Sequence, residues 1–180
     1  WKLFEEGMKL YDRGDFSKSL ENLNEALSIY ETTGEKRGIG IICKQIGILY
    51  ENMAQYKRAF AYYKKALEIF EEIQDKIMIG KLYNNIGVIY EDIREDTEAL
   101  YYYEKALKLA KETNNEFGER IAIGNIGDIF LSRKAYFEAL ENYQKIGDLP
   151  RLATTYSKLK KFQEAFKCAE ESLKIELEIG

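Results

Sequence analysis

The sequence contains no histidine, and its two cysteines, Cys43 and Cys168, lie far apart without a CxxC pair. Histidine and paired cysteines are the usual zinc ligands, so we expect neither a metal site nor a cofactor. Histidine is also the side chain most used for acid–base catalysis near neutral pH, and no GxxxxGK phosphate loop is present. We therefore expect a protein that is not an enzyme, with Cys43 as a buried, inert thiol.

Long apolar runs and an excess of basic charge are also missing. No apolar stretch approaches the roughly 20 residues that a membrane-spanning helix needs, and the N-terminus lacks the apolar segment of a signal peptide. The formal net charge is −4, and lysine and arginine alternate with acidic residues along the chain. We expect a cytoplasmic protein whose partners include neither membrane nor nucleic acid.

Proline is almost absent, because Pro150 is the single one in 180 residues. Helix interiors are therefore nearly free of the residue that breaks them, and alanine, leucine, glutamate, lysine and tyrosine dominate the composition. Hydrophobic residues make up 46% of the chain, which is enough for a continuous buried core. These features predict an all-α protein.

Glycine recurs with a constant step of 40 residues, at Gly7, Gly47, Gly87 and Gly127. The same step relates small residues at 12 and 19 positions after the glycine, and aromatic residues or leucine at 3 and 16 positions after it. These positions are Leu10, Tyr50, Tyr90 and Phe130; Ser19, Ala59, Ala99 and Ala139; Leu23, Tyr63, Tyr103 and Tyr143; and Ala26, Ala66 and Ala106. The spacings are helical, and they place small residues where two antiparallel helices approach closely and large ones beside them. Each unit is therefore predicted to be a helical hairpin.

A fifth, shortened unit follows, with Ala153, Tyr156, Ala165 and Ala169 at the corresponding positions and its first helix beginning near Pro150. The step from Gly127 to Ala153 is shorter than 40, so the second helix of the fourth unit is expected to be short. The predicted array has ten helices in five hairpins. Its units are residues 1–36, 37–76, 77–116, 117–148 and 149–180.

Turn residues between the paired helices differ from unit to unit. In the first unit Gly14 permits the bend and Asp15 is expected to cap the second helix. In the third unit Asp96 replaces the aromatic residue of the other units, and we expect it to act as the N-cap instead.

This pattern of a small residue, an aromatic three positions later, alanine, aromatic and alanine resembles the tetratricopeptide repeat. The usual repeat has about 34 residues, and the longer period resembles the arrays of kinesin light chains, G-protein-regulator adaptors and bacterial peptide sensors. The resemblance implies a right-handed superhelical solenoid in which the first helices of successive hairpins line a concave groove. It therefore implies a protein- or peptide-binding surface along those helices.

An amide series lies two residues before the repeat glycine, at Gln45, Asn85 and Asn125, with Asn84 beside it. Amides carry donors and acceptors, so a row of them can satisfy the backbone of an extended peptide. They can equally bridge neighbouring helices within the array. The predicted peptide-binding residues of the groove are Gln45, Asn85, Asn125, Asn84, Lys44, Asn52, Lys81, Asp92 and Asp128.

The family members that hold a chaperone's C-terminal carboxylate use two lysines, an arginine and two asparagines. Lys44 and Asn85 match that set, whereas Ile48, Ile121 and Asn125 stand where an asparagine, a lysine and an arginine belong. The resemblance therefore does not favour chaperone tails.

Acidic side chains make part of the groove negative, which favours a basic ligand or is ordinary solvated surface. They are Glu51, Glu91, Asp92 and Asp128.

Two aromatic groups have both a structural and a functional interpretation. Phe4, Met8 and Tyr11, joined by Trp1, form a stripe with helical spacing that belongs to the core or anchors a ligand side chain. Tyr62 and Tyr102 adjoin repeat-core tyrosines and are expected to form a surface patch.

The leading hypothesis for function is a scaffold that binds a protein or peptide in its concave groove. The alternative is a ligand-sensing regulatory domain that binds a short signalling peptide and controls an attached output domain. A structural role is a third hypothesis, in which arrays associate end to end through uncapped faces at Trp1 and Gly180. Because the chain stops at a unit junction, we expect further repeats or a covering partner in the full protein.

Overall fold

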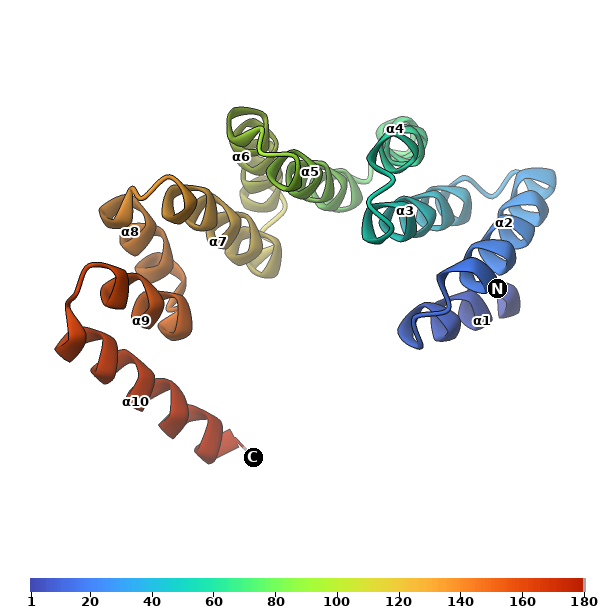
Figure 1. Cartoon of the computed structure of the whole chain (residues 1–180). Coiled ribbons are helices and arrows are strands. Elements are labelled where there is room, and N and C mark those ends of the chain that lie inside the picture. The colour runs from blue at the N-terminus through green and yellow to red at the C-terminus, as the bar shows by residue number, and fades with distance from the viewer. Residues whose placement is uncertain (180) are drawn as a thin grey trace.

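The computed structural model describes residues 1–179, which form ten α-helices and no strand. The helices pair in sequence as five hairpins that follow one another in an open arc, with the two chain ends far apart (Figure 1). Their bounds are α1 (Lys2–Asp12), α2 (Phe16–Thr33), α3 (Lys36–Asn52), α4 (Tyr56–Glu72), α5 (Lys76–Asp92), α6 (Asp96–Glu112), α7 (Glu116–Ser132), α8 (Tyr136–Ile146), α9 (Leu149–Lys158) and α10 (Phe162–Ile179). The predicted all-α repeat array is confirmed.

The repeat glycines bring the two helices of each hairpin together. Tyr103 is fully buried, and a Cβ added to Gly87 would lie 2.5 Å from its ring. A Cβ on Gly127 would lie 2.6 Å from the ring of Tyr143. A side chain at either glycine would overlap a buried ring, so the close approach that the spacing predicts depends on the missing Cβ.

The turns show one predicted cap and one correction. The carboxylate of Asp15 accepts the backbone N–H of Lys18 at 3.3 Å, as expected for the N-cap of α2. The prediction that Asp96 caps α6 is wrong, because Glu95 is the N-cap residue and Asp96 is the first residue inside the helix. The carboxylate of Asp96 instead pairs with Arg133 of the following hairpin turn at 3.0 Å.

The array changes its period at the fourth hairpin. Helix α8 has 11 residues, whereas α4 and α6 each have 17, so the expected shortening is confirmed. Helix α9 begins at Leu149 with Pro150 in its first turn, and the carboxylate of Asp148 accepts the N–H of Arg151 at 3.1 Å. A glycine in the left-handed region, Gly147 with φ 65°, ends α8.

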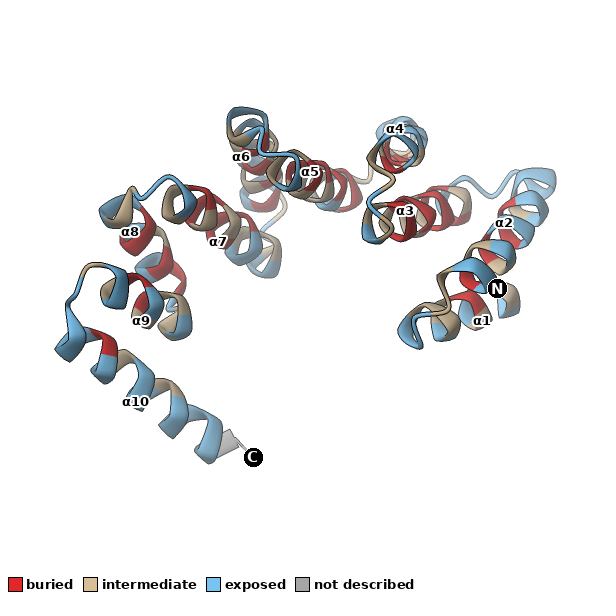
Figure 2. Ribbon diagram, in the orientation of Figure 1, coloured by how far each residue is buried: buried red, intermediate tan, exposed pale blue. Residues whose placement is uncertain are grey.

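Buried residues follow the seam between the helices from α2 to α9 (Figure 2). Ile146 occupies the place of an alanine in earlier units, and it is buried beside Gly124. Helix α10 differs, because Ala165 is the one buried residue among its described side chains. Within residues 1–179 no helix combines the length and hydrophobicity needed to cross a bilayer.

Candidate functional site

A pocket of about 200 Å³ opens where the first helices of three successive hairpins meet. Helix α5 contacts both α3 and α7, and α6 closes the pocket from behind. The floor consists of small residues, namely Gly80, Ala106, Ala110 and Gly118, with Ile48, Ile77, Phe117 and Ile121 along the sides. The predicted binding residues that line it are Lys44, Lys81, Asn84 and Asn85.

Two lysines give this pocket its charge. Burial, and then the nearby charge of Lys81, lower the pKa of Lys44 to about 8. The ammonium of Lys44 donates to the side-chain oxygen of Gln45 at 2.6 Å. A third lysine at the edge, Lys76, is paired with Glu112 at 3.0 Å. The interior of the pocket is therefore apolar with a cationic wall.

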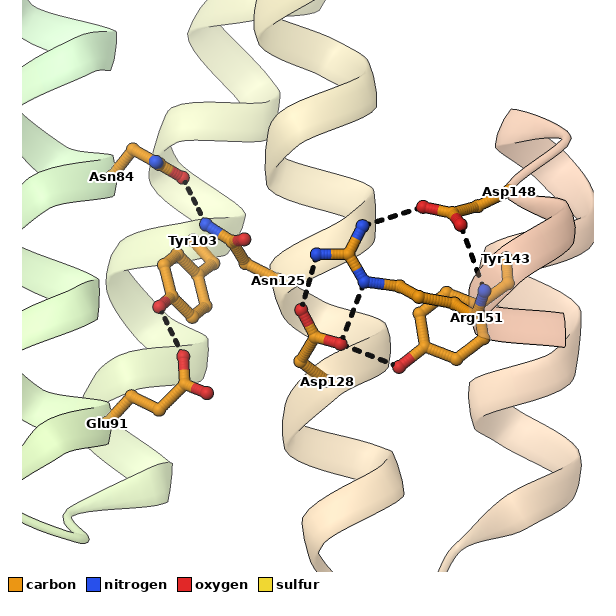
Figure 3. Close-up of polar contacts among 8 residues, drawn as sticks. All are labelled: Asn84, Glu91, Tyr103, Asn125, Asp128, Tyr143, Asp148 and Arg151. Atoms are coloured by element: carbon orange, nitrogen blue, oxygen red, sulfur yellow. Dashed lines mark hydrogen bonds and ion pairs between the residues drawn. The ribbon is translucent and has the colours of Figure 1, made fainter. Parts of the chain in front are cut away.

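The amides outside this pocket connect the first helices of neighbouring hairpins. The Gln45 amide of α3 donates to the sulfur of Met8 in α1 at 3.0 Å. The Asn125 amide of α7 donates to the side-chain oxygen of Asn84 in α5 at 3.0 Å (Figure 3). These contacts are of the helix-bridging kind, and they leave Asn85 as the member of the predicted series that lines the pocket.

A further amide, Asn52 near the end of α3, also bridges neighbouring hairpins. Its side-chain nitrogen donates to the hydroxyl of Tyr11 in α1 at 2.9 Å. Asn52 lies in the last turn of α3 and is not among the residues that line the pocket.

The acidic side chains of the groove accept hydrogen bonds from tyrosines of the second helices. Glu51 accepts from the Tyr63 hydroxyl at 2.5 Å, and Glu91 accepts from the Tyr103 hydroxyl at 2.7 Å (Figure 3). Burial raises the pKa of both carboxyl groups. Asp92 accepts a longer bond of 3.4 Å from Tyr56. These carboxylates therefore tie the two helices of a hairpin, or adjacent hairpins, to one another.

Asp128 is neutralised by Arg151, a residue that the sequence analysis did not select. The guanidinium makes two bonds to the carboxylate, at 3.1 and 3.0 Å, and a third of 2.6 Å to Asp148 (Figure 3). The Tyr143 hydroxyl donates to the same carboxylate at 2.8 Å. Asp128 therefore presents no free negative charge to a ligand.

The aromatic residues singled out from the sequence pack mainly on the core. Phe4 and Tyr11 lie against buried residues, and Trp1 stays half exposed while it packs on Phe4, with ring centroids 4.6 Å apart. Tyr62 stacks on Tyr50 at 5.6 Å between ring centroids, and Tyr102 stacks on Tyr90 at 5.4 Å. Tyr62 and Tyr102 are both half-buried, so they do not form the predicted surface patch.

The Cys43 thiol of α3 is free and fully buried. Burial raises its pKa to about 11, so almost none of it is in the reactive thiolate form near neutral pH. The predicted burial of Cys43 is confirmed.

Two family models described as tetratricopeptide repeat match the sequence, one over residues 7–72 and the other over residues 81–117 and 151–175. No curated protein sequence matches the chain. Five helical hairpins in series make the described part of the chain an α-helical repeat solenoid. The chain belongs to the tetratricopeptide repeat proteins.

Solved structures with the same fold include kinesin light chain and Rap proteins. BtubC (BKLC) of P. vanneervenii is 20% identical with a TM-score of 0.74, over 96% of this chain and 78% of that one. A set of nearly identical kinesin-light-chain TPR-like repeats from P. anserina is 14% identical with a TM-score of 0.77, over 99% and 95%. The Rap conjugation gene regulator of plasmid pLS20, solved with the Phr* peptide, is 13% identical with a TM-score of 0.83, over 98% and 53%.

Proposed function

We propose that this array binds an extended segment of another protein, or a free peptide, along the groove formed by its first helices, and that it carries out no catalysis. The observation that carries the proposal is the pocket between α3, α5 and α7, with its apolar floor and the Lys44 and Lys81 side chains on its wall. A preformed pocket on a rigid helical framework limits the entropy lost on binding. It therefore suits recognition of a flexible chain.

Within the groove we assign different tasks to the predicted residues. Lys44, Lys81, Asn84 and Asn85 line the pocket and are proposed to contact the ligand. Gln45, Asn125 and Asn52 are bonded to neighbouring hairpins and do not line this pocket, so we propose that they set the spacing between first helices. Asn84 accepts the bond from Asn125 through its oxygen, and we propose that its amide N–H groups contact the ligand. Asp92 and Asp128 lie toward the ends of α5 and α7, where Asp128 is held by Arg151.

A displayed library of random ten-residue peptides, selected on the immobilised array, tests the proposal. We expect peptides that bind the wild-type array and lose affinity for a Lys44→Ala, Asn85→Ala double variant. The matched control is Lys64→Ala, Asn24→Ala, which removes an exposed lysine and an exposed asparagine from second helices. Equal loss in both variants, or equal binding by both, contradicts the assignment of the groove.

A second candidate is a regulatory domain that senses a short signalling peptide. It is favoured by two Rap proteins with this fold that were solved with peptides, the pLS20 regulator with Phr* and a Rap protein with Competence and Sporulation Factor. This chain spans 53% and 63% of those two chains. Ligand length separates the candidates, because a free peptide of about ten residues suffices for a sensor whereas a scaffold needs a larger partner surface.

A further inference from the structure

The pocket lies where the repeat loses an aromatic ring. The 40-residue step places Tyr30, Phe70 and Ala110 at the same position in the second helices of the first three hairpins. In the second hairpin Phe70 is fully buried, and its ring would lie 2.7 Å from a Cβ added to Gly40. In the third hairpin Gly80 keeps the place of Gly40, but Ala110 stands in place of the ring.

The neighbouring helix α7 also has a glycine beside Ala110. Tyr30 of the first hairpin lies over Gly38, and the same 40-residue step leads from Gly38 to Met78 and then to Gly118. A Cβ added to Gly118 would meet the side chain of the N-cap residue Asn115 at 2.6 Å and, across the two hairpins, the Cβ of Ala110 at 3.4 Å. Ala110 therefore lies between two glycines, Gly80 of its own hairpin and Gly118 of the next, at the places where earlier hairpins accommodate a ring.

The open space is also not filled by a side chain from elsewhere in the array. A Cβ added to Gly80 would meet nothing closer than the Cβ of Leu109 at 3.6 Å. Phe117 and Ile77 at the mouth are exposed to 71% and 44%, so large apolar side chains surround the opening without entering it. An apolar cavity of this kind gains free energy when an apolar group enters it.

The charges beside the cavity indicate what adjoins that apolar group. Lys36 and Lys76 begin α3 and α5 and are paired with Glu72 and Glu112 of the second helices. Among the residues that the structure describes, Lys44 and Lys81 form no such pair, although both line the cavity. A carboxylate next to the bound group would therefore meet two uncompensated cations at a largely apolar wall.

We infer that the cavity is a specificity pocket for a phenylalanine side chain of the bound segment, which takes the place that Phe70 fills one hairpin earlier, with an Asp or Glu side chain of the ligand at Lys44 and Lys81. This inference rests on the proposed function and specifies its ligand as an extended segment with phenylalanine beside an acidic residue. The acid is a side chain rather than a chain end, because the pocket is open along the groove toward α7, where Phe117 and Ile121 continue into a second hollow.

The probe for this pocket is 3-phenylpropionate, which carries one phenyl ring and one carboxylate. Protein-observed NMR should show shifts at α5, α6 and α7 on titration, with weaker binding of 3-phenylpropanamide, which lacks the charge, and of propionate, which lacks the ring. The Ala110→Phe variant rebuilds the arrangement of Phe70 and Gly40. It should stay folded and bind the probe at least about tenfold more weakly, since burial of the phenyl ring supplies most of the affinity.

The Gly80→Ala variant is a second test in case Ala110→Phe is overpacked and does not fold. Its new methyl group lies in the pocket and has room beside Leu109. Equal binding of 3-phenylpropionate by the wild-type array and by either folded variant overturns the inference. Stronger binding of 3-phenylpropanamide than of 3-phenylpropionate overturns the assignment of an acidic ligand side chain to Lys44 and Lys81.

Peptides selected on the wild-type array separate this inference from the proposed function. Enrichment of phenylalanine next to Asp or Glu, with binding lost in Ala110→Phe, supports both. Selected peptides without that preference, bound equally by Ala110→Phe, overturn the pocket assignment and leave the groove function standing. Failure to select any peptide counts against the proposed function, whereas 3-phenylpropionate binding that Ala110→Phe abolishes still supports the pocket.

Discussion

Two glycines in the middle of α5 have opposite surroundings. A Cβ on Gly87 would lie 2.5 Å from the Tyr103 ring, whose hydroxyl is held by Glu91 at 2.7 Å. A Cβ on Gly80 would meet nothing closer than 3.6 Å. We predict that Gly87→Ala lowers the free energy of unfolding by about 1–3 kcal/mol through overpacking, whereas Gly80→Ala raises it by up to about 1 kcal/mol through helix propensity.

Urea denaturation of both variants, followed by far-UV circular dichroism, measures the two changes against the wild-type array. The pair is its own control, because both substitutions add one methyl group to the same helix. A stabilising effect of Gly87→Ala would show that Tyr103 moves aside at little cost.

Lys44 makes stability depend on pH. Burial lowers its folded-state pKa to about 8, below the ordinary value of 10.5, with Lys81 of α5 as the other charge facing it. Below pH 8 both the folded and the unfolded chain carry the proton, and the cost of burying the charge is present in full. Between about pH 8 and 10.5 the folded chain loses the proton first, so this cost is relieved as the pH rises. The variant Lys44→Met should therefore be more stable than wild type at pH 7, by a margin that shrinks at pH 9.5.

Urea titrations of the two proteins at pH 7 and pH 9.5 give this margin, because the comparison at each pH isolates the contribution of Lys44. A margin that does not change with pH would mean that Lys44 stays hydrated in the fold. The same protonation controls the proposed ligand site, so 3-phenylpropionate should bind wild type more weakly as the pH rises through 8.

At the scale of the helices, the second hairpin shows what a filled pocket contributes. Phe70 is fully buried against Gly40, so Phe70→Ala should leave a cavity and lower the free energy of unfolding by about 3–5 kcal/mol. Addition of benzene as the probe should restore part of the loss, because an uncharged ring can occupy the apolar cavity that the Phe70 ring leaves. Thermal unfolding with and without the probe tests this, and a variant as stable as wild type would mean that the helices collapse into the space.

The hairpins could be predicted from the sequence because each depends on spacings within about 30 residues, such as that from Gly87 to Tyr103. The partners between hairpins could not. Whether Gln45 reaches Met8, or Asn125 reaches Asn84, depends on the separation of first helices, which the local pattern does not specify. Arg151 was missed for a related reason: it stands two residues before Ala153, the position of the amide series, but the shortened α8 moves it away from the 40-residue step.

The pocket, in contrast, left a signal in the sequence that was not used. At the 40-residue step Phe70 is followed by Ala110, whereas Gly40 is followed by another glycine, Gly80. This difference is visible in the sequence alone. Interpreting it required knowledge that these positions face each other within a hairpin, which the structure supplied. Departures from a repeat thus carry functional information once the contacts of each position are known.

In the whole molecule, stability is expected to be a sum of terms between neighbouring hairpins, because each helix packs mainly on the next in sequence. The fifth hairpin is the weakest part of this series, since α10 buries little beyond Ala165. Its ion pairs to the rest of the array include those of Arg151 in α9 with Asp128 in α7, at 3.0 and 3.1 Å. Arg151 therefore couples the fifth hairpin to the fourth.

Replacement of Arg151 by methionine should loosen α9 and α10 while it leaves α3 to α6 unchanged. Loss of the two-point contact to Asp128 is expected to reduce the local opening free energy by ~1.5 kcal/mol, or about tenfold in amide exchange. Hydrogen exchange read by mass spectrometry measures each segment separately, and Lys158→Met, an exposed position of α9, is the control. Faster exchange throughout the array would show that it unfolds as one unit, because in a nearest-neighbour solenoid the loss of an end contact leaves the central hairpins protected by their own neighbours.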